Sequence, residues 1–173
     1  MNEHAISEAA NPSATLENRP FDDIRPGDTA SMTRTLTVTD VKTFAVLSGD
    51  LNPTHIDEDL ARTLGEGHLV AHSMLSGALI SSVLGNELPG PGTRYVRQDL
   101  RFVRPIQPED TVTATVTVRE KRGETGTVVL DCRCTNGEGQ MLAEGEAEVI
   151  APTRKVVLPR PEVADNRWLV RLR

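Results

Sequence analysis

Apolar and polar residues alternate with a period of two through most of the second half of the chain. The alternation covers four segments: DLRFVR (99–104), TVTATVTV (111–118), TVVLDCRC (127–134) and LAEGEAEVI (142–150). Turn residues link these segments in QPED, KRGETG and TNGEGQ. The pattern is typical of strands in an antiparallel sheet that has one wet face. An earlier segment, TASMTRTLT (29–37), also predicts a strand.

Residues 70–88 show a different pattern, which predicts a long helix. From Ser73 through Asn86 no side chain is charged, and small or apolar residues occupy nearly every helical face. A helix that is apolar on all sides is normally buried on all sides, so we expect this one in the middle of the domain. The simplest arrangement is an antiparallel sheet curled around this single helix.

One sheet around one helix would still leave part of the helix and one sheet edge uncovered. The sequence shows no internal repeat. Uncovered sheet edges invite pairing with another chain, so we expect a homodimer or a higher assembly of dimers.

The remaining segments predict two shorter helices and two extensions. Thr39 and Asp40 can cap a helix that ends at Gly49, and a second helix is expected through DEDLARTLG (57–65). The first 20 residues are polar and show no periodicity, which is typical of disorder. After Ala151 the alternation is lost. We therefore divide the chain into a disordered segment at 1–20, one domain at 21–151 and a C-terminal extension at 152–173.

Composition and charge narrow the possible functions. Aromatic residues make up only 3% of the chain and the formal net charge is −6, so an aliphatic core is expected and nucleic-acid binding is disfavoured. No apolar run reaches the ~20 residues of a membrane span, and the N-terminus does not resemble a secretory signal. We expect a cytoplasmic protein, in which Cys132 and Cys134 are reduced core thiols rather than a disulfide or a zinc site.

The candidate chemistry lies in SGDLNPTH (48–55), which places Asp50 and His55 on one short loop. Asn52-Pro53 makes this loop rigid, because proline fixes its own φ and restricts the preceding residue. An imidazole and a carboxylate that reach the same water molecule suit paired acid–base work. On spacing alone, ordinary loop residues with a histidine bonded to a backbone carbonyl remain the more common explanation.

The start of the predicted long helix, LVAHSM (69–74), strengthens the functional interpretation. Free N–H groups and the positive end of the helix dipole point out of the core there. Such a position can stabilise the oxygen of a thioester carbonyl as negative charge develops on it.

FAVLSGDLNPTHID (44–57) and the stretch from Leu69 to Val118 resemble the MaoC-like, or R-specific, enoyl-CoA hydratases. The resemblance covers roughly residues 20–150. It implies an α+β hot-dog fold, an antiparallel sheet wrapped around a long central helix. It also implies reversible hydration of trans-2-enoyl-CoA to (R)-3-hydroxyacyl-CoA, with no cofactor because coenzyme A is part of the acyl-CoA substrate. LDCRCTNGEGQ and APTRKV further resemble the N-terminal domain of bifunctional enoyl-CoA hydratase/phosphate acetyltransferase proteins, which would make this chain a stand-alone or excised hydratase module.

The resemblance also assigns roles to individual residues. Asp50 and His55 match the catalytic dyad, and Asn52 matches the asparagine that orients the loop or the dyad. Ser73 stands where the family usually has the glycine whose N–H binds the thioester oxygen, since AHGML has become AHSML here. Ser81 matches a position that lines the substrate pocket, although a helix serine bonded to the preceding turn is an equal alternative. No metal is expected.

Several features are weaker indications. His68 and His72 are four residues apart but lack a third metal ligand, so we interpret His72 as a structural residue at the helix start. Arginines at 94, 97, 101 and 104 could meet the phosphates of coenzyme A, although solvated strand residues are the more common explanation. Two other functions stay open. One is a hot-dog acyl-CoA thioesterase, and the other is a non-catalytic acyl-CoA-binding module, which the change at Ser73 favours.

Overall fold

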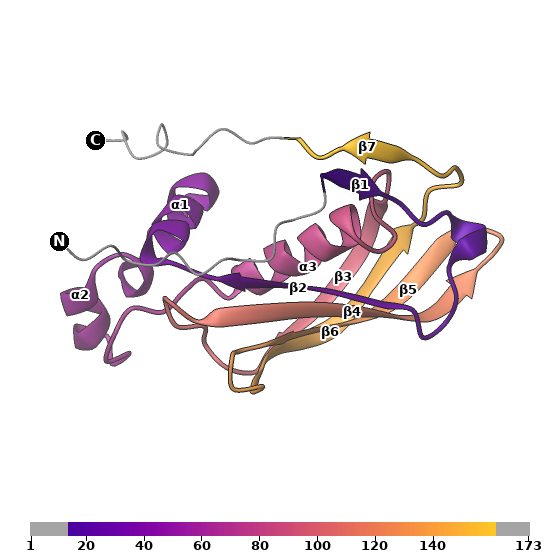
Figure 1. Cartoon of the computed structure of the whole chain (residues 1–173). Coiled ribbons are helices and arrows are strands. Elements are labelled where there is room, and N and C mark those ends of the chain that lie inside the picture. The colour runs from indigo at the N-terminus through magenta and orange to yellow at the C-terminus, as the bar shows by residue number, and fades with distance from the viewer. Residues whose placement is uncertain (1–13, 162–173) are drawn as a thin grey trace.

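A computed structural model gives the structure of the chain, which is described here for residues 14–161. Its centre is a five-stranded antiparallel sheet with the strand order β2-β4-β5-β6-β3 (Figure 1). The strands are β2 (Thr29–Thr35), β3 (Arg94–Phe102), β4 (Thr111–Arg122), β5 (Thr127–Thr135) and β6 (Met141–Ile150). The five predicted strands are confirmed, and β3 and β4 are longer than their alternating segments.

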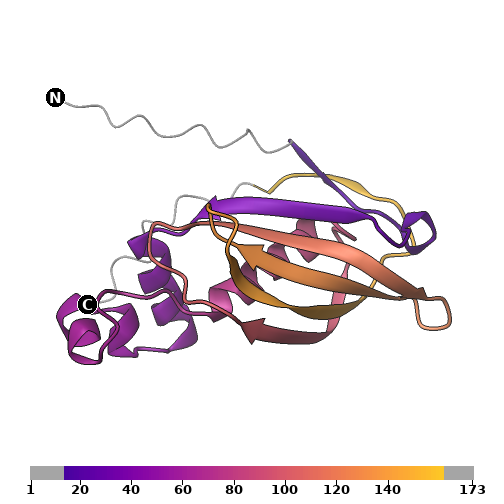
Figure 2. The same ribbon diagram turned by 90° about the horizontal axis from the view of Figure 1, so that it is seen from below.

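Helix α3 (Met74–Asn86) lies against one face of this sheet, and no helix of the described residues covers the opposite face (Figures 1 and 2). Its buried residues, among them Leu79, Ile80 and Val83, join the inward side chains of β4, β5 and β6 in one core. The predicted hot-dog arrangement of a sheet around a central helix is therefore confirmed. The helix is shorter than the predicted 70–88 because Ala71 is extended and forms a β-bridge with Ile106.

One face of α3 is left exposed by the part of the chain that the structure describes. Met74, Ala78, Ser81 and Gly85, which follow one another at helical spacing, are all exposed. The expectation that the helix is buried on every side is therefore wrong for the single chain. The expectation that one layer leaves part of the helix uncovered is correct.

Two short helices lie together beyond one end of the sheet (Figures 1 and 2). Helix α1 (Val38–Ser48) begins two or three residues earlier than a cap at Thr39 or Asp40 predicts, because Thr37 and Asp40 form a reciprocal capping box. It ends at Gly49, whose φ of 74° is the left-handed conformation that glycine adopts without strain. Helix α2 (Glu58–Thr63) lies within the expected 57–65, and the Asp57 side chain caps its start.

The two ends of the described chain pair with each other. Strand β1 (Thr15–Glu17) forms an antiparallel ribbon with β7 (Val157–Pro159) on the α3 side of the sheet (Figure 1). The buried Asn18 amide ties the ribbon down, donating to the carbonyls of Pro91 and Arg154. The sequence predicted neither strand, and ordered structure therefore starts before residue 21. Residues 1–13 and Trp168 lie outside the described part of the chain.

The cysteines of β5 face α3 from inside the core. Cys132 and Cys134 are free and buried, as predicted. Burial raises the pKa of the Cys132 thiol to about 12 and that of Cys134 to about 11, so both are held as neutral thiols. Among residues 14–161, no helix has both the length and the apolar character of a bilayer span.

Candidate active site

Asp50 follows directly after the glycine that ends α1. Its backbone N–H donates to the Ser48 hydroxyl at 3.2 Å, and its carboxylate accepts the Asn52 N–H at 3.2 Å. The carboxylate is still half exposed, with 52% of the side chain accessible. The loop therefore fixes the backbone of Asp50 while leaving acceptor capacity free for a ligand.

The Asn-Pro turn presents His55. Residues Pro53–His55 form a 3-10 turn, η2, and the Asn52 side-chain oxygen accepts the Thr54 N–H at its start. His55 Nδ1 donates to the carbonyl of Val70 at 2.7 Å. Because a carbonyl only accepts, Nδ1 carries the proton, and Nε2 is left free to exchange a proton with a ligand. The bond to a backbone carbonyl, the alternative considered for this histidine, thus also prepares it for acid–base work.

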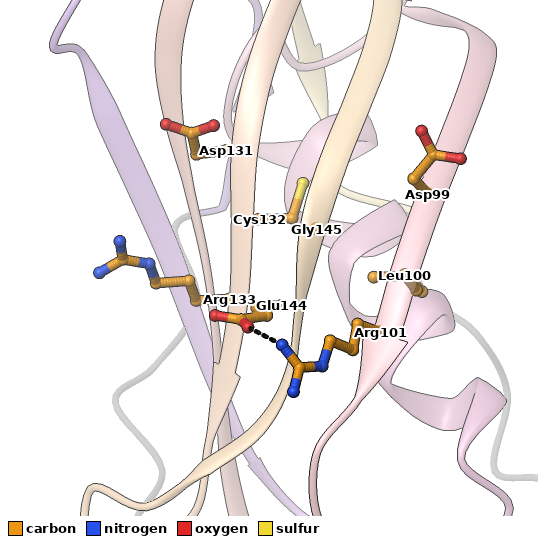
Figure 3. Close-up of a pocket in the computed structure, with 8 residues that line it drawn as sticks. All are labelled: Asp99, Leu100, Arg101, Asp131, Cys132, Arg133, Glu144 and Gly145. Carbon is orange, nitrogen blue, oxygen red and sulfur yellow. Dashed lines mark ion pairs between the residues drawn. The ribbon is translucent and has the colours of Figure 1, made fainter.

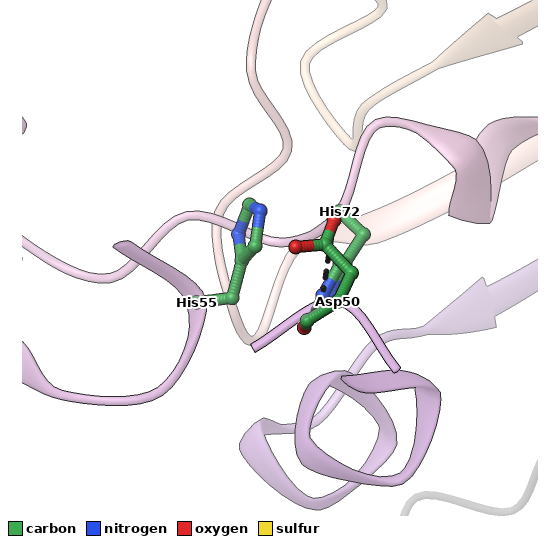
Figure 4. A group of neighbouring side chains, drawn as sticks. All are labelled: Asp50, His55 and His72. Atoms are coloured by element: carbon green, nitrogen blue, oxygen red, sulfur yellow. Dashed lines mark hydrogen bonds and ion pairs between the residues drawn. The ribbon is translucent and has the colours of Figure 1, made fainter. Parts of the chain in front are cut away.

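A third side chain, His72, completes the cluster (Figure 4). It is only 3% exposed, and its Nε2 lies 3.1 Å from the backbone oxygen of Asp50 and 4.0 Å from the carboxylate. Its ring lies against that of His55, with centroids 3.8 Å apart, and Phe44 packs beside it. Burial lowers the pKa of His72, and the neighbouring His55 lowers it further. The sequence placed this residue correctly at the helix start but gave no sign of its contact with Asp50.

The three residues bring their polar atoms into one small space. One ligand atom each from Asp50, His55 and His72 lies within 4.8 Å of the others. A water molecule that accepts or donates at about 2.8 Å to two groups bridges a separation of this size. The structure therefore brings the predicted pair, Asp50 and His55, to within reach of one shared water.

Ser73 occupies the residue between His72 and the first turn of α3. Its φ of −57° and ψ of −30° are already helical, so no glycine is required here for backbone reasons. Its backbone N–H makes no hydrogen bond to any residue that the structure describes. A free N–H at the positive end of a helix, next to the dyad, is suited to an oxyanion.

Comparison with known proteins identifies the family of this chain. The MaoC like domain family matches residues 24–135 of the chain. The chain belongs to this family. It is 46% identical over 134 residues to an (R)-specific enoyl-CoA hydratase of Rhodospirillum rubrum, covering 78% of this chain and 92% of that protein. It is 36% identical to a 3-hydroxybutyryl-CoA dehydratase of Methylorubrum extorquens, covering 80% and 88%.

Solved structures of (R)-hydratases superpose on this MaoC-like domain. The unliganded R-hydratase PhaJ1 of Pseudomonas aeruginosa superposes with a TM-score of 0.83 at 37% identity, covering 87% of this chain and 97% of that one. The (R)-hydratase of Aeromonas caviae superposes with a TM-score of 0.72 at 35% identity, covering 75% and 98%. The hot-dog fold expected from the sequence is thereby shown.

Ser81 is the one predicted site residue of this MaoC-like domain that lies apart from the cluster. It is exposed on the uncovered face of α3, eight residues beyond Ser73. At a rise of 1.5 Å per residue, that separation is about 12 Å along the helix axis. A ligand would reach Ser81 only if it ran along this face of α3.

The same cluster has the residue types of a metal site, but its bonding is unfavourable for one. A metal ligand nitrogen must be unprotonated, whereas His72 Nε2 and His55 Nδ1 both donate to backbone carbonyls. Only His55 Nε2 and the Asp50 carboxylate stay accessible, because His72 Nδ1 is buried. His68 is exposed and bonds its own neighbour, the Glu66 carbonyl.

A separate hollow of about 570 Å³ lies on the strands and not at the dyad (Figure 3). It is lined mainly by charged side chains of β3, β5 and β6, and Arg101 pairs with Glu144 across it. Arg97 is likewise paired, with Asp99 and Glu148. These two arginines, for which solvated strand residues were the more common explanation, are therefore part of an ion-paired sheet face.

Proposed function

We propose that this MaoC-like domain catalyses the reversible hydration of trans-2-enoyl-CoA to (R)-3-hydroxyacyl-CoA. The enzyme is a hydro-lyase, as are the hydratase and dehydratase relatives that it matches over nearly their whole length. The observation that carries the proposal is the convergence of the Asp50 carboxylate and the His55 ring within 4.8 Å, beside the start of α3.

The geometry supports a syn addition in which both dyad members act on one face of the substrate. One of them takes a proton from the shared water, whose oxygen bonds to the β-carbon of the enoyl group. The other enters this step protonated and gives its proton to the α-carbon, so that H and OH are added to the substrate. The Ser73 N–H stabilises the negative charge that develops on the thioester oxygen between these events. The proton taken from water then passes from the first member to the second, which restores the dyad for the next turnover. This route requires no cofactor beyond the coenzyme A that the substrate carries.

The active form is proposed to be a homodimer joined through the free edge of β3. This edge strand is nine residues long, and no other strand within residues 14–161 pairs with its outer side, where backbone groups are therefore open to a partner. Along it, Tyr95, Val96 and Phe102 are all more than 40% exposed, as is Val103 just after it. Exposed apolar side chains on a long edge strand favour pairing with a second copy of the chain.

Two further expectations belong to the same proposal. The free, buried thiols of Cys132 and Cys134 support a reducing compartment such as the cytoplasm. The resemblance of LDCRCTNGEGQ to bifunctional hydratase/phosphate acetyltransferase proteins favours a kinship with their hydratase domain.

The test is a crotonyl-CoA assay that follows loss of the enoyl absorbance and release of free thiol in the same sample. Asp50→Asn and His55→Gln should each lower kcat by about 10²–10⁴-fold, the usual contribution of a general acid or base. Asp22→Asn and His68→Gln are matched controls, because both residues are exposed and lie outside the cluster. Thiol release would instead indicate a thioesterase, and tight binding without turnover would indicate a binding module. Full hydratase activity in both dyad variants would refute the proposal.

A further inference from the structure

The extended segment Val70–His72, just before α3, contacts both members of the dyad. The Val70 carbonyl accepts the His55 Nδ1–H at 2.7 Å, and the Val70 N–H donates to the Thr54 carbonyl at 3.0 Å. The Ala71 N–H donates to the carbonyl of Ile106 at 2.8 Å, which ties the segment to the loop before β4. The His55 side of the dyad is thus held by a backbone segment that is itself hydrogen-bonded on both sides.

The Asp50 side of the dyad is held by a side chain of the same segment, that of His72. His72 Nε2 donates to the backbone carbonyl of Asp50 at 3.1 Å, across 22 residues of sequence. Its ring also forms the surface on which the His55 ring lies, at 3.8 Å between centroids. His72 is therefore in contact with both dyad residues while being almost inaccessible to a substrate, at 3% exposure.

The bonding fixes the protonation of His72. Since the Asp50 carbonyl can only accept, Nε2 carries a proton. Nδ1 is buried without a hydrogen-bond partner among the described residues. A proton there would create a buried, unpaired donor on a charged ring, which costs far more than an unpaired acceptor on a neutral ring. The ring is thus a fixed neutral donor rather than a proton shuttle.

We infer that His72 is a positioning residue for this reaction, an inference that rests on the proposed function. Its Nε2–H holds the Asp50 backbone, and its ring holds the plane of His55, so that both groups face the same water. Loss of the donor lets the Asp50 loop move. A displacement of about 1 Å in a reacting group can cost about 100-fold in rate, although substrate contacts elsewhere stay intact.

Three substitutions separate the donor from the ring. His72→Phe keeps a ring against His55 but lacks the N–H. His72→Gln keeps an amide N–H near the position of Nε2 but lacks the ring, and His72→Ala lacks both. We expect His72→Phe to lower kcat for crotonyl-CoA by about 10- to 100-fold with KM changed by less than about threefold. His72→Gln should recover most of that loss, and His72→Ala should be the slowest.

Circular dichroism and thermal unfolding establish that each variant is folded. Wild-type kcat in a folded His72→Phe overturns the inference, and so does an equal loss in the Phe and Gln variants, which would indicate packing alone. A change confined to KM overturns it as well. Asp50→Asn and His55→Gln are measured beside them. If the Asp50 and His55 variants are as active as the wild type, the proposed function itself has failed. If they are inactive but the His72 variants are fully active, only the role of His72 is wrong.

A measurement on the unaltered protein covers the case in which the variants do not fold. Nitrogen-15 NMR of the histidine rings distinguishes a protonated Nε2 from a protonated Nδ1 and from a charged ring. We expect His72 as the neutral Nε2–H form at pH 7. A charged ring or the Nδ1–H form would overturn the inference, because neither is compatible with a fixed donor to Asp50 and a neutral, buried Nδ1.

Discussion

The imidazole rings of His55 and His72 lie nearly face to face, with centroids 3.8 Å apart and ring planes 30° from parallel. Two charged imidazoles at this distance would repel each other. The two rings differ in what surrounds them, because His72 is buried and Phe44 packs on it, whereas His55 is partly accessible. The pair is therefore asymmetric, and of the two rings His55 is the one placed to exchange the proton that the proposed reaction requires.

The buried member of this pair makes the fold sensitive to mild acid. Burial lowers the pKa of His72 in the folded chain below 6.5, the ordinary value that applies to the unfolded chain. At a pH between the folded and the unfolded pKa, the unfolded chain therefore binds more protons than the folded one. The contribution of His72 to stability is full above pH 6.5 and is lost as the pH falls through that window. Urea unfolding of the wild type should therefore show a falling free energy of unfolding from pH 7 to pH 5.

His72→Phe isolates this effect, because it removes the titrating group and keeps a ring. The variant should lose less stability than the wild type over the same pH interval. His68→Gln, at an exposed histidine, should behave as the wild type does. Parallel curves for the wild type and His72→Phe would contradict the assignment.

The sequence predicted the fold well where the signal is local and periodic. The period-two segments became β3 to β6, and Gly49 marked the end of α1 as expected. The prediction failed where contacts between residues far apart in the sequence determine where an element begins. The bridge between Ala71 and Ile106 delayed the start of α3, and no local pattern encodes it.

The site shows the same division. Asp50 and His55 stood out because a rigid Asn-Pro turn keeps them close in sequence as well as in space, and the resemblance to MaoC-like hydratases then assigned the dyad and Asn52. His72 was interpreted only as structural, since its link is to a backbone carbonyl 22 residues away, an atom that every residue type carries. Side-chain chemistry in the sequence cannot indicate such a partner.

Ser73 offers a direct test of the oxyanion site, because the proposed donor is a backbone N–H. Ser73→Pro removes that N–H, and proline is compatible with the φ of −57° at this helix start. We expect kcat to fall by about 10²–10³-fold, as for other losses of an oxyanion donor. Ser73→Ala and Ser73→Gly keep the N–H and should stay close to the wild type. Equal activity of the proline and alanine variants in the crotonyl-CoA assay would exclude this N–H.

Gly145 of β6 is required by a close approach of strands. A Cβ built on it would lie 2.0 Å from the Asp99 carbonyl oxygen and 3.1 Å from the Leu100 Cα, both on β3. Since the obstacle is backbone, Gly145→Ala should destabilise the fold by about 3 kcal/mol, the upper part of the usual range for overpacking. Gly123→Ala is the control, because nothing lies within 4 Å of its Cβ and its φ is not positive. Equal urea midpoints for the two variants would show that β3 can move away freely.

The β3 edge predicts how the chain assembles. Val96 is 55% exposed at the irregularity between Tyr95 and Arg97, so a lysine there is tolerated by a single chain. In a dimer formed across this edge, the ammonium group of the same lysine would be desolvated. This desolvation penalty applies to the dimer and not to the monomer. Sedimentation velocity should therefore show a wild-type dimer and a Val96→Lys protein shifted towards monomer. Leu158→Lys is a matched control, since Leu158 is also exposed and apolar but lies on β7, away from the edge. A monomeric wild type, or the same shift in both variants, would place the interface elsewhere.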